Sequence, residues 1–154
     1  MLADDDLFDM TRDQRARICK VLGETLAEQP DVAFALIHGS FVTEGPFHDI
    51  DIAAYFVGSD PSDINRRAYS LGELLGNTLE GGHGIRPCPP IDVRALNAAP
   101  LGFCYQVLRQ GRLLGNRDDV LRTEWTVAII SRYLDIKPLY EMALKEAMTS
   151  WPSI

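Results

Sequence analysis

The chain has 154 residues, of which 46% are hydrophobic and 24% charged, and its formal net charge is -7. These values predict a globular protein of one domain that can bury a core without disulfides or metals. Since no apolar run approaches the roughly 20 residues of a membrane-spanning helix, we expect no membrane insertion. The acidic N-terminus lacks the basic and apolar segments of a secretory signal, which favours a cytoplasmic location. The negative charge argues against direct, non-specific nucleic-acid binding.

The cysteines are too few and too scattered for a structural role. Cys19, Cys88 and Cys104 form no metal-ligand spacing, and an odd number of scattered thiols does not suit a disulfide framework. We therefore expect free thiols in a reducing compartment.

Hydrophobic periodicity predicts the elements of the first half of the chain. A helix is expected over 11–29, with apolar residues at helical spacing, and Pro30 ends it. The short apolar segments 31–38 and 49–57 are typical of strands, and 39–48 between them is irregular.

The second half is predicted in the same way. A helix over 64–79 precedes a glycine- and proline-rich loop at 80–90, a strand at 91–96 and a helix at 100–110. Leu113 and Leu114 form a short apolar stretch for which the pattern predicts neither a helix nor a strand. Two helices follow, at 117–134 and 138–148, and Pro138 marks the break between them.

This order indicates an α+β fold, in which helices pack on a small mixed β-sheet. We expect a single domain over residues 1–154. Its core spans about 11–116, and the C-terminal helices at about 117–150 form an extension packed on that core, because no linker precedes them.

The residues most informative about function are two aspartates at the start of the second strand. Asp49 and Asp51 are two residues apart, so their side chains project from the same face of the strand. Two adjacent carboxylates repel each other unless a cation neutralises them. Mg²⁺ prefers oxygen ligands, and a pair of such ions suits an in-line displacement at a phosphate.

A third carboxylate and a turn complete the pattern. Asp92 lies near the start of the third strand and would reach the same site if the two strands are neighbours. Gly39 and Ser40 end the first strand, where glycine allows backbone amides to approach a phosphate. A lone Asp-x-Asp or Gly-Ser is most often a surface feature or a turn, so only their combination indicates a site.

These motifs resemble a known group of enzymes. The segment HGSFVTEGPFHDIDIAAYF is similar to the Gly-Ser and Asp-x-Asp signature of the DNA polymerase β-like nucleotidyltransferase superfamily, and the small size resembles its minimal nucleotidyltransferase (MNT) branch. The segments IDVRALNAAPLGFCYQVLRQGRLLGNRD and RTEWTVAIISRYLDIKPLYEMALKE resemble the third-aspartate strand and the C-terminal helices of MntA-type antitoxins. The resemblance covers nearly the whole chain from Val32 onward.

The resemblance implies an activity and a partner. In that family the nucleotidyltransferase transfers AMP from ATP to a tyrosine of a HEPN-domain ribonuclease toxin and so silences it. Gly39 and Ser40 would then hold the triphosphate. Asp49 and Asp51 would bind two Mg²⁺ ions, and Asp92 would bind the catalytic ion and help to deprotonate the acceptor hydroxyl.

The chain departs from the family pattern at two places. Eight residues separate Ser40 from Asp49, whereas the antitoxins usually have ten. No Arg or Lys follows Gly-Ser in 41–44, and His48 stands where a serine is usual. The first alternative function is therefore an antitoxin that neutralises its partner by binding alone. The second is nucleotidyl transfer to a small molecule of the aminoglycoside type, although the chain is short for it.

Several other residues have an open role. His48 could contact a phosphate, but shaping the strand entry is the simpler interpretation. Arg66, Arg67 and Arg86 could contact phosphate or acceptor, and solvation at the surface is the simpler expectation for each. Trp125, Tyr133 and Tyr140 suit helix packing as well as an exposed patch for a partner. The acceptor, the nucleotide preference and homo- or hetero-oligomer formation are not determined by these residues.

Overall fold

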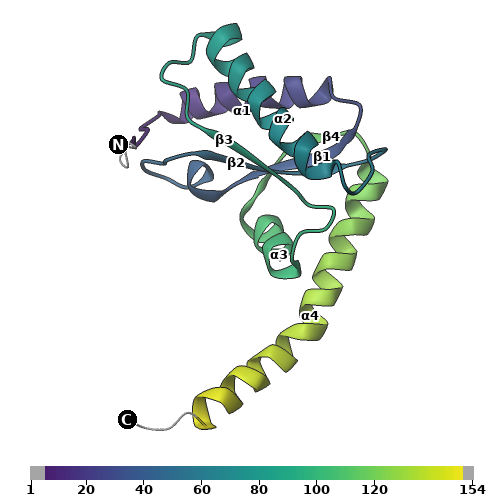
Figure 1. Ribbon diagram of the computed structural model, residues 1–154. Coiled ribbons are helices and arrows are strands. Elements are labelled where there is room, and N and C mark those ends of the chain that lie inside the picture. Colours follow the sequence, from purple (N-terminus) through teal and green to yellow (C-terminus); the bar gives the residue numbers. More distant parts are fainter. Residues whose placement is uncertain (1–5, 151–154) are drawn as a thin grey trace.

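A computed structural model describes residues 6–150 of the chain (Figure 1). In chain order its elements are α1 (Arg12–Ala27), β1 (Val32–His38), a 3-10 turn η1 (Gly39–Val42), β2 (Ile50–Phe56), α2 (Ile64–Asn77), a π-helical turn η2 (Thr78–Gly82), β3 (Ile91–Ala95), α3 (Leu101–Gln110), β4 (Arg112–Asn116) and α4 (Asp119–Ser150). This mixed α+β arrangement confirms the predicted fold class. No helix within residues 6–150 is long and apolar enough to cross a membrane.

The four strands form one sheet in the order β3-β2-β1-β4. β1 pairs antiparallel with both β2 and β4, whereas β2 and β3 run parallel. β1 lies inside the sheet, and its residues Val32–Ile37 are all buried, because helices cover both faces. The sheet thus brings the end of β1 beside the starts of β2 and β3.

Each face of the sheet has its own apolar core. On one face, α1 and α2 pack through residues such as Leu22 and Leu71, which are fully buried. On the other face, Phe34 and Leu36 pack with Cys104 and Val107 of α3 and with Ile129 of α4. Figure 1 shows α1 and α2 on the opposite side of the sheet from α3.

Local signals explain where the first helix begins. Thr11 caps α1 by accepting a hydrogen bond from the backbone N–H of Gln14, whose side chain accepts one from the N–H of Thr11. The predicted helix over 64–79 becomes α2 and then η2, with Leu71, Leu75 and Leu79 buried. Leu74 of the same helix is 38% exposed and lies off this buried side.

Two features of the second half differ from the sequence predictions. The stretch around Leu113 and Leu114 is a strand, β4, which adds to the free edge of β1. The prediction of two helices separated at Pro138 is wrong, because α4 is continuous through Pro138. Every residue from 134 to 150 is exposed, so water can solvate the carbonyl group that the proline leaves without a donor, and the helix continues.

The C-terminal helix packs on the core over only part of its length. α3 has 10 residues and α4 has 32, so at 1.5 Å per residue α3 spans about 15 Å and α4 about 48 Å. Figure 1 shows the far half of α4 extending away from the sheet. The expected packing of the C-terminal region therefore holds for its first half alone, and the domain division near residue 116 stays a prediction.

Candidate active site

The sheet register brings the aspartates of β2 and β3 together. Asp51 is directly opposite His38 of β1 on one side and Asp92 of β3 on the other. Paired residues of neighbouring strands share a face, and Asp49 shares that face because it precedes Asp51 by two positions. Since Ala53 of the same strand belongs to the core beneath α3, the aspartates lie on the α3 side of the sheet.

The pKa of the Asp51 carboxyl reflects the crowding of negative charge in this cluster. Burial, followed by the charges of Asp49 and Asp92, raises the pKa of Asp51 to about 6. A hydrogen bond with Asp49 also stabilises the protonated form, whereas the charge of Arg94 acts in the opposite direction. A bound cation would offset the repulsion between these carboxylates and stabilise their ionised form.

Gly39 is the point of closest approach to this carboxyl. Its φ is +76°, in the left-handed region that favours glycine. A Cβ placed on Gly39 would lie 2.4 Å from Oδ2 of Asp51. The position therefore requires glycine for two reasons, and the Gly-Ser turn stands directly beside Asp51.

Ser40 lies in the η1 turn that follows. Its carbonyl accepts hydrogen bonds from the backbone N–H of Thr43, at 3.2 Å, and from Oγ1 of Thr43, at 2.8 Å. The side chain of Ser40 has no hydrogen bond among the described residues, and the residue is half-buried. Its hydroxyl is thus free to donate to a ligand.

Arg15 of α1, which sequence reasoning missed, holds the loop after Gly-Ser. Its guanidinium donates to the carbonyl of Phe41, at 2.7 Å, to that of Thr43, at 3.0 Å, and to that of Gly45. It also stacks over Phe47, 4.8 Å from the ring centroid. The shortened loop is therefore organised by a residue 26 positions or more away in the sequence.

His38, Arg94 and Phe103 are the other residues that sequence reasoning missed. The Arg94 guanidinium lies 4.2 Å from the ring centroid of Phe103, and the His38 ring meets Phe103 edge-on at 5.6 Å. Burial and then the charge of Arg94 hold the pKa of His38 below its ordinary value, against Asp92 and Asp49. The Nε2 atom of His38 is buried without a hydrogen-bond partner among the described residues.

Arg94 had one usable signal in the sequence. It follows Asp92 by two positions in a strand, which places both side chains on the same face. The structure thus supplies a cation on the face of the three aspartates, although 41–44 contains none. His38 and Phe103 had no comparable signal, because a histidine at a strand end and a phenylalanine in a helix are ordinary.

The side chains of the three aspartates are not arranged to bind one metal ion together. Within residues 6–150, no three acidic, imidazole or thiol side chains are already placed to share one metal ion. Asp49 and Asp51 are half-buried, and Asp92 is exposed and free to adopt another rotamer. The backbone positions and the oxygen donors suit Mg²⁺, but ion binding requires side-chain rotation.

Two grooves run beside the edge strand β3. One of about 450 Å³ reaches Asp92, and the other, of about 560 Å³, reaches Arg94. Both are also lined by Asn65 and Ala68 of α2. The two grooves therefore leave open space beside Asp92 and beside Arg94.

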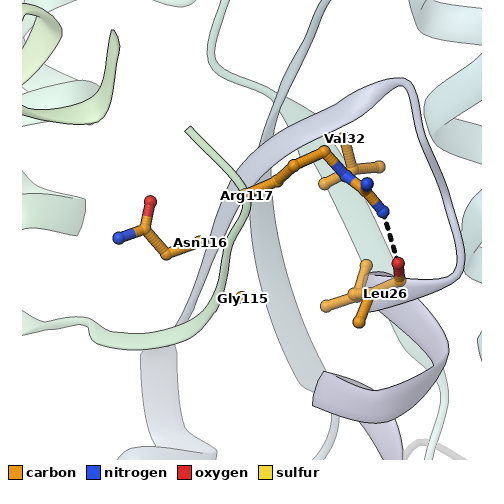
Figure 2. Close-up of a pocket in the computed structure, with 6 residues that line it drawn as sticks. Leu26, Val32, Gly115, Asn116 and Arg117 are labelled. Atoms are coloured by element: carbon orange, nitrogen blue, oxygen red, sulfur yellow. Dashed lines mark hydrogen bonds between the residues drawn. The ribbon is translucent and has the colours of Figure 1, made fainter. Parts of the chain in front are cut away.

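A different cavity lies at the other end of β1 and takes no part in this site. It measures about 250 Å³ and is lined by Leu26, Ala27, Val32, Gly115, Asn116 and Arg117 (Figure 2). Val32 begins β1, whereas the aspartates meet its last residue, His38. Arg117 donates a hydrogen bond to the carbonyl of Ala27, which ties the end of β4 to the end of α1.

The remaining polar candidates lie outside the cluster or have structural roles. His48 and Arg86 are exposed, and Arg66 makes only a 4.0 Å contact with Asp63. Arg67, expected to be solvated, is a structural residue, since its Nε and one terminal nitrogen donate to Asp31 at 2.6 and 2.9 Å.

The cysteines and most of the aromatic candidates are also structural residues outside the aspartate cluster. Cys19 and Cys88 are half-buried and Cys104 is buried, all as free thiols, in agreement with the sequence prediction. Trp125 packs against Phe34 at 5.3 Å, and Tyr133 stacks on Tyr105 at 3.6 Å. Tyr140 is 65% exposed.

Comparison with known proteins agrees with this geometry. The family model described as polymerase beta, nucleotidyltransferase, matches residues 20–120, which contain Gly39, Ser40 and the three aspartates. Comparison of the sequence with curated proteins gave no match.

Three solved structures share the fold at low sequence identity. The first is the tri-AMPylated Shewanella oneidensis HEPN toxin in complex with MNT antitoxin, at 22% identity and TM-score 0.59, with 90% of this chain and 99% of that chain covered. A toxin–antitoxin structure with AMP-PNP has 22% identity, TM-score 0.61 and 87% and 98% coverage. The MntA–HepT toxin–antitoxin structure has 20% identity, TM-score 0.58 and 90% and 99% coverage.

Proposed function

The chain belongs to the polymerase β nucleotidyltransferase family, and we propose that it transfers AMP from ATP to a tyrosine hydroxyl of a HEPN-type toxin, acting as an antitoxin. The observation that carries this proposal is the register of the sheet. It pairs Asp51 with Asp92, and the Asp51 carboxyl lies beside Gly39. Carboxylates on two strands next to a Gly-Ser turn are what a nucleotide triphosphate and its cations require.

Mg²⁺ fits the donors of this site. Asp49, Asp51 and Asp92 would hold it, because they supply only carboxylate oxygens and because a cation would relieve the repulsion that raises the pKa of Asp51. When bound, the metal neutralises phosphate charge and lowers the pKa of a bound hydroxyl. We propose two ions, as in the family that the sequence resembles.

The residues of the chain have distinct tasks in the transfer. The backbone of Gly39 and the hydroxyl of Ser40 bind the triphosphate, and Arg94 contributes the positive charge that the loop lacks. Asp92 takes the proton of the acceptor hydroxyl. The acceptor oxygen forms a bond to the α-phosphorus, the bond from that phosphorus to the bridging oxygen breaks, and pyrophosphate leaves.

The partner and the nucleotide are supported by the structural neighbours. One neighbour contains a tri-AMPylated HEPN toxin bound to an MNT antitoxin, and another contains AMP-PNP. This chain shares their fold over nearly the whole length of the matched chains. A HEPN-type toxin as acceptor and ATP as donor are therefore the natural assignment.

A second function is favoured by the loop after Gly-Ser. Segment 41–44 carries no cation, and the carbonyls of Phe41 and Thr43 are already occupied by Arg15. A chain that held its partner by binding alone would need neither ATP nor the aspartates. Arg94 favours the enzyme over this alternative, because it supplies a cation for phosphate on the face of the aspartates.

The test uses a HEPN-type toxin as the acceptor and ATP labelled at the α-phosphate. We expect Mg²⁺-dependent label on the partner, lost with EDTA and reduced by several orders of magnitude in Asp49→Asn and Asp92→Asn. Glu44→Gln, in the exposed loop, is the matched control and should label normally. An unlabelled partner that is nevertheless neutralised by Asp49→Asn would establish the binding-only function instead.

A further inference from the structure

A groove crosses the free edge of the sheet next to the aspartate cluster. β3 is the outermost strand on that side, so no strand of the described chain pairs with its outer edge. α2 lies close to this strand, since a Cβ on Gly72 would be 3.2 Å from the carbonyl oxygen of Ile91. The groove of about 450 Å³ is lined by α2 on one side and by β3, including Asp92, on the other. We call it the α2–β3 groove.

The position of this groove suits the entry of an acceptor. Gly39 lies beside Asp51 of β2, whereas Asp92 of β3 lies one strand further out. In an in-line displacement the attacking oxygen and the leaving pyrophosphate are on opposite sides of the phosphorus. With the triphosphate at the Gly-Ser turn, the acceptor hydroxyl therefore arrives from the side of Asp92 and the free edge, where the α2–β3 groove lies.

The α2 wall of the groove is polar and is long enough for a short peptide. Asn65, Tyr69 and Glu73 are four residues apart, so they follow one another along one side of the helix, and all three are exposed. From Asn65 to Glu73 the helix rises about 12 Å, which is the length of about four residues of extended chain. The groove therefore has room for a peptide segment as well as for a single side chain.

Glu73 gives this groove a charge that nothing in the described chain balances. Its side chain makes no ion pair within residues 6–150. The residues that line the groove include two carboxylates, Glu73 and Asp92, and no Lys or Arg. Asp92 serves the transfer itself, so Glu73 is the carboxylate that remains for recognition. A segment that enters the groove is thus favoured when it carries a positive charge.

We propose that the α2–β3 groove receives the segment of the acceptor protein that carries the modified tyrosine, and that Glu73 selects a segment with a Lys or Arg a few residues from that tyrosine. This inference rests on the proposed AMP transfer and names the class of its acceptor. Tyr69, which is 70% exposed, packs on the segment from the side of α2. The tyrosine oxygen bonds to the α-phosphorus, its proton passes to Asp92, and pyrophosphate leaves.

The first test measures transfer from labelled ATP while the concentration of the acceptor, a HEPN-type toxin, is varied. Glu73→Gln should raise the KM for the acceptor about three- to tenfold, because it removes one partly solvated charge pair, and should leave the KM for ATP unchanged. Glu24→Gln is the matched control, since Glu24 is an exposed glutamate of α1 that lines neither groove beside β3. An equal rise in both variants would show an effect of net charge and overturn the role of Glu73.

The second test changes the shape of the groove and not its charge. Asn65 lines both grooves beside β3, so Asn65→Trp should lower kcat/KM for the acceptor tenfold or more. Asn77→Trp, at the exposed end of the same helix, lines neither groove and should behave like the wild type. Calorimetric titration with ATP and the Tm show whether each variant keeps its nucleotide site and its fold.

Photo-crosslinking separates this docking from AMP transfer itself. With p-benzoylphenylalanine in place of Tyr69, irradiation should link the chain to the acceptor peptide that contains the labelled tyrosine. The same group in place of Arg66, which is exposed and lines neither groove, should not form this link.

Each combination of results decides one of the two proposals. A labelled acceptor with a normal KM in Glu73→Gln and Asn65→Trp, or with cross-links only outside the labelled peptide, overturns docking in the groove and leaves AMP transfer standing. An acceptor that cross-links at position 69 but takes up no label retains the docking and overturns the transfer. An acceptor with neither label nor cross-link overturns both.

Discussion

A methyl group on Gly39 would lie 2.4 Å from Oδ2 of Asp51, well inside the contact distance of a carbon and an oxygen. The residue that turns the chain after β1 is therefore also the residue that makes room for the central carboxylate of the cluster. Gly39 links the two halves of the motif, since one backbone position sets both the turn and the placement of Asp51.

Gly39→Ala should lose both stability and activity. The left-handed φ of +76° costs a non-glycine residue about 1–2 kcal/mol, and the new Cβ displaces Asp51 in addition. We expect a lower Tm and a loss of AMP transfer. Gly58→Ala is the matched control, because Gly58 has a φ of +75° but nothing within 4 Å of its Cβ position. It should be destabilised yet active, and equal activity in both variants would contradict this role of Gly39.

Asp51→Asn should stabilise the metal-free protein above about pH 6 and not at about pH 4. Burial and the neighbouring aspartates raise the pKa of Asp51 to about 6 in the folded protein, so the wild type loses stability as pH rises from its ordinary carboxyl pKa to that value. The gain should be about 1 kcal/mol, because the carboxyl is partly solvated. Denaturant unfolding in EDTA at the two pH values measures it, and a gain of the same size at both would exclude this cause.

Arg94→Gln should weaken ATP binding more than it slows turnover. Its guanidinium is the cation that stacks on Phe103 beside the aspartates, and one charged contact to phosphate corresponds to about 1.5–3 kcal/mol, or roughly tenfold or more in KM. Phe103→Leu should shift KM in the same direction by less, since it removes only the stacking partner. Steady-state kinetics with varied ATP is the measurement.

Arg109→Gln provides the comparison for Arg94, because Arg109 is an exposed arginine near the end of α3. It should leave KM for ATP unchanged. An Arg94→Gln variant with normal KM and reduced kcat alone would show that Arg94 acts on the acceptor or the transition state rather than on ATP binding.

Arg67→Ala should destabilise the fold by about 1 kcal/mol at neutral pH, because Arg67 makes two hydrogen bonds to the Asp31 carboxylate and one to Gln29. The hydrogen bonds from Arg67 lower the pKa of Asp31, so this stabilisation is present above the ordinary carboxyl pKa and disappears as acid protonates Asp31. Arg66→Ala, one position away and with a side chain 86% exposed, should have no measurable effect. Unfolding free energies across the acid range compare the two variants.

Local patterns in the sequence were enough for most of the elements and for the outline of the site. β1 and β2 are apolar runs between turn formers, and alternation along a strand alone puts Asp49 and Asp51 on one face. The turn at Gly39-Ser40 could be predicted because a glycine directly after a buried strand commonly marks a turn. These features depend on neighbours in the sequence, so they need no knowledge of the fold.

Contacts between distant segments required the tertiary structure. β4 has little strand character of its own and forms because β1 offers a free edge, and α4 continues through Pro138 because water surrounds it there. The partner of Asp51 on β3 depended on a parallel register that no local pattern specifies. Arg15, His38 and Phe103 were missed for the same reason: each contacts a residue far along the chain, and only packing decides which distant side chains meet.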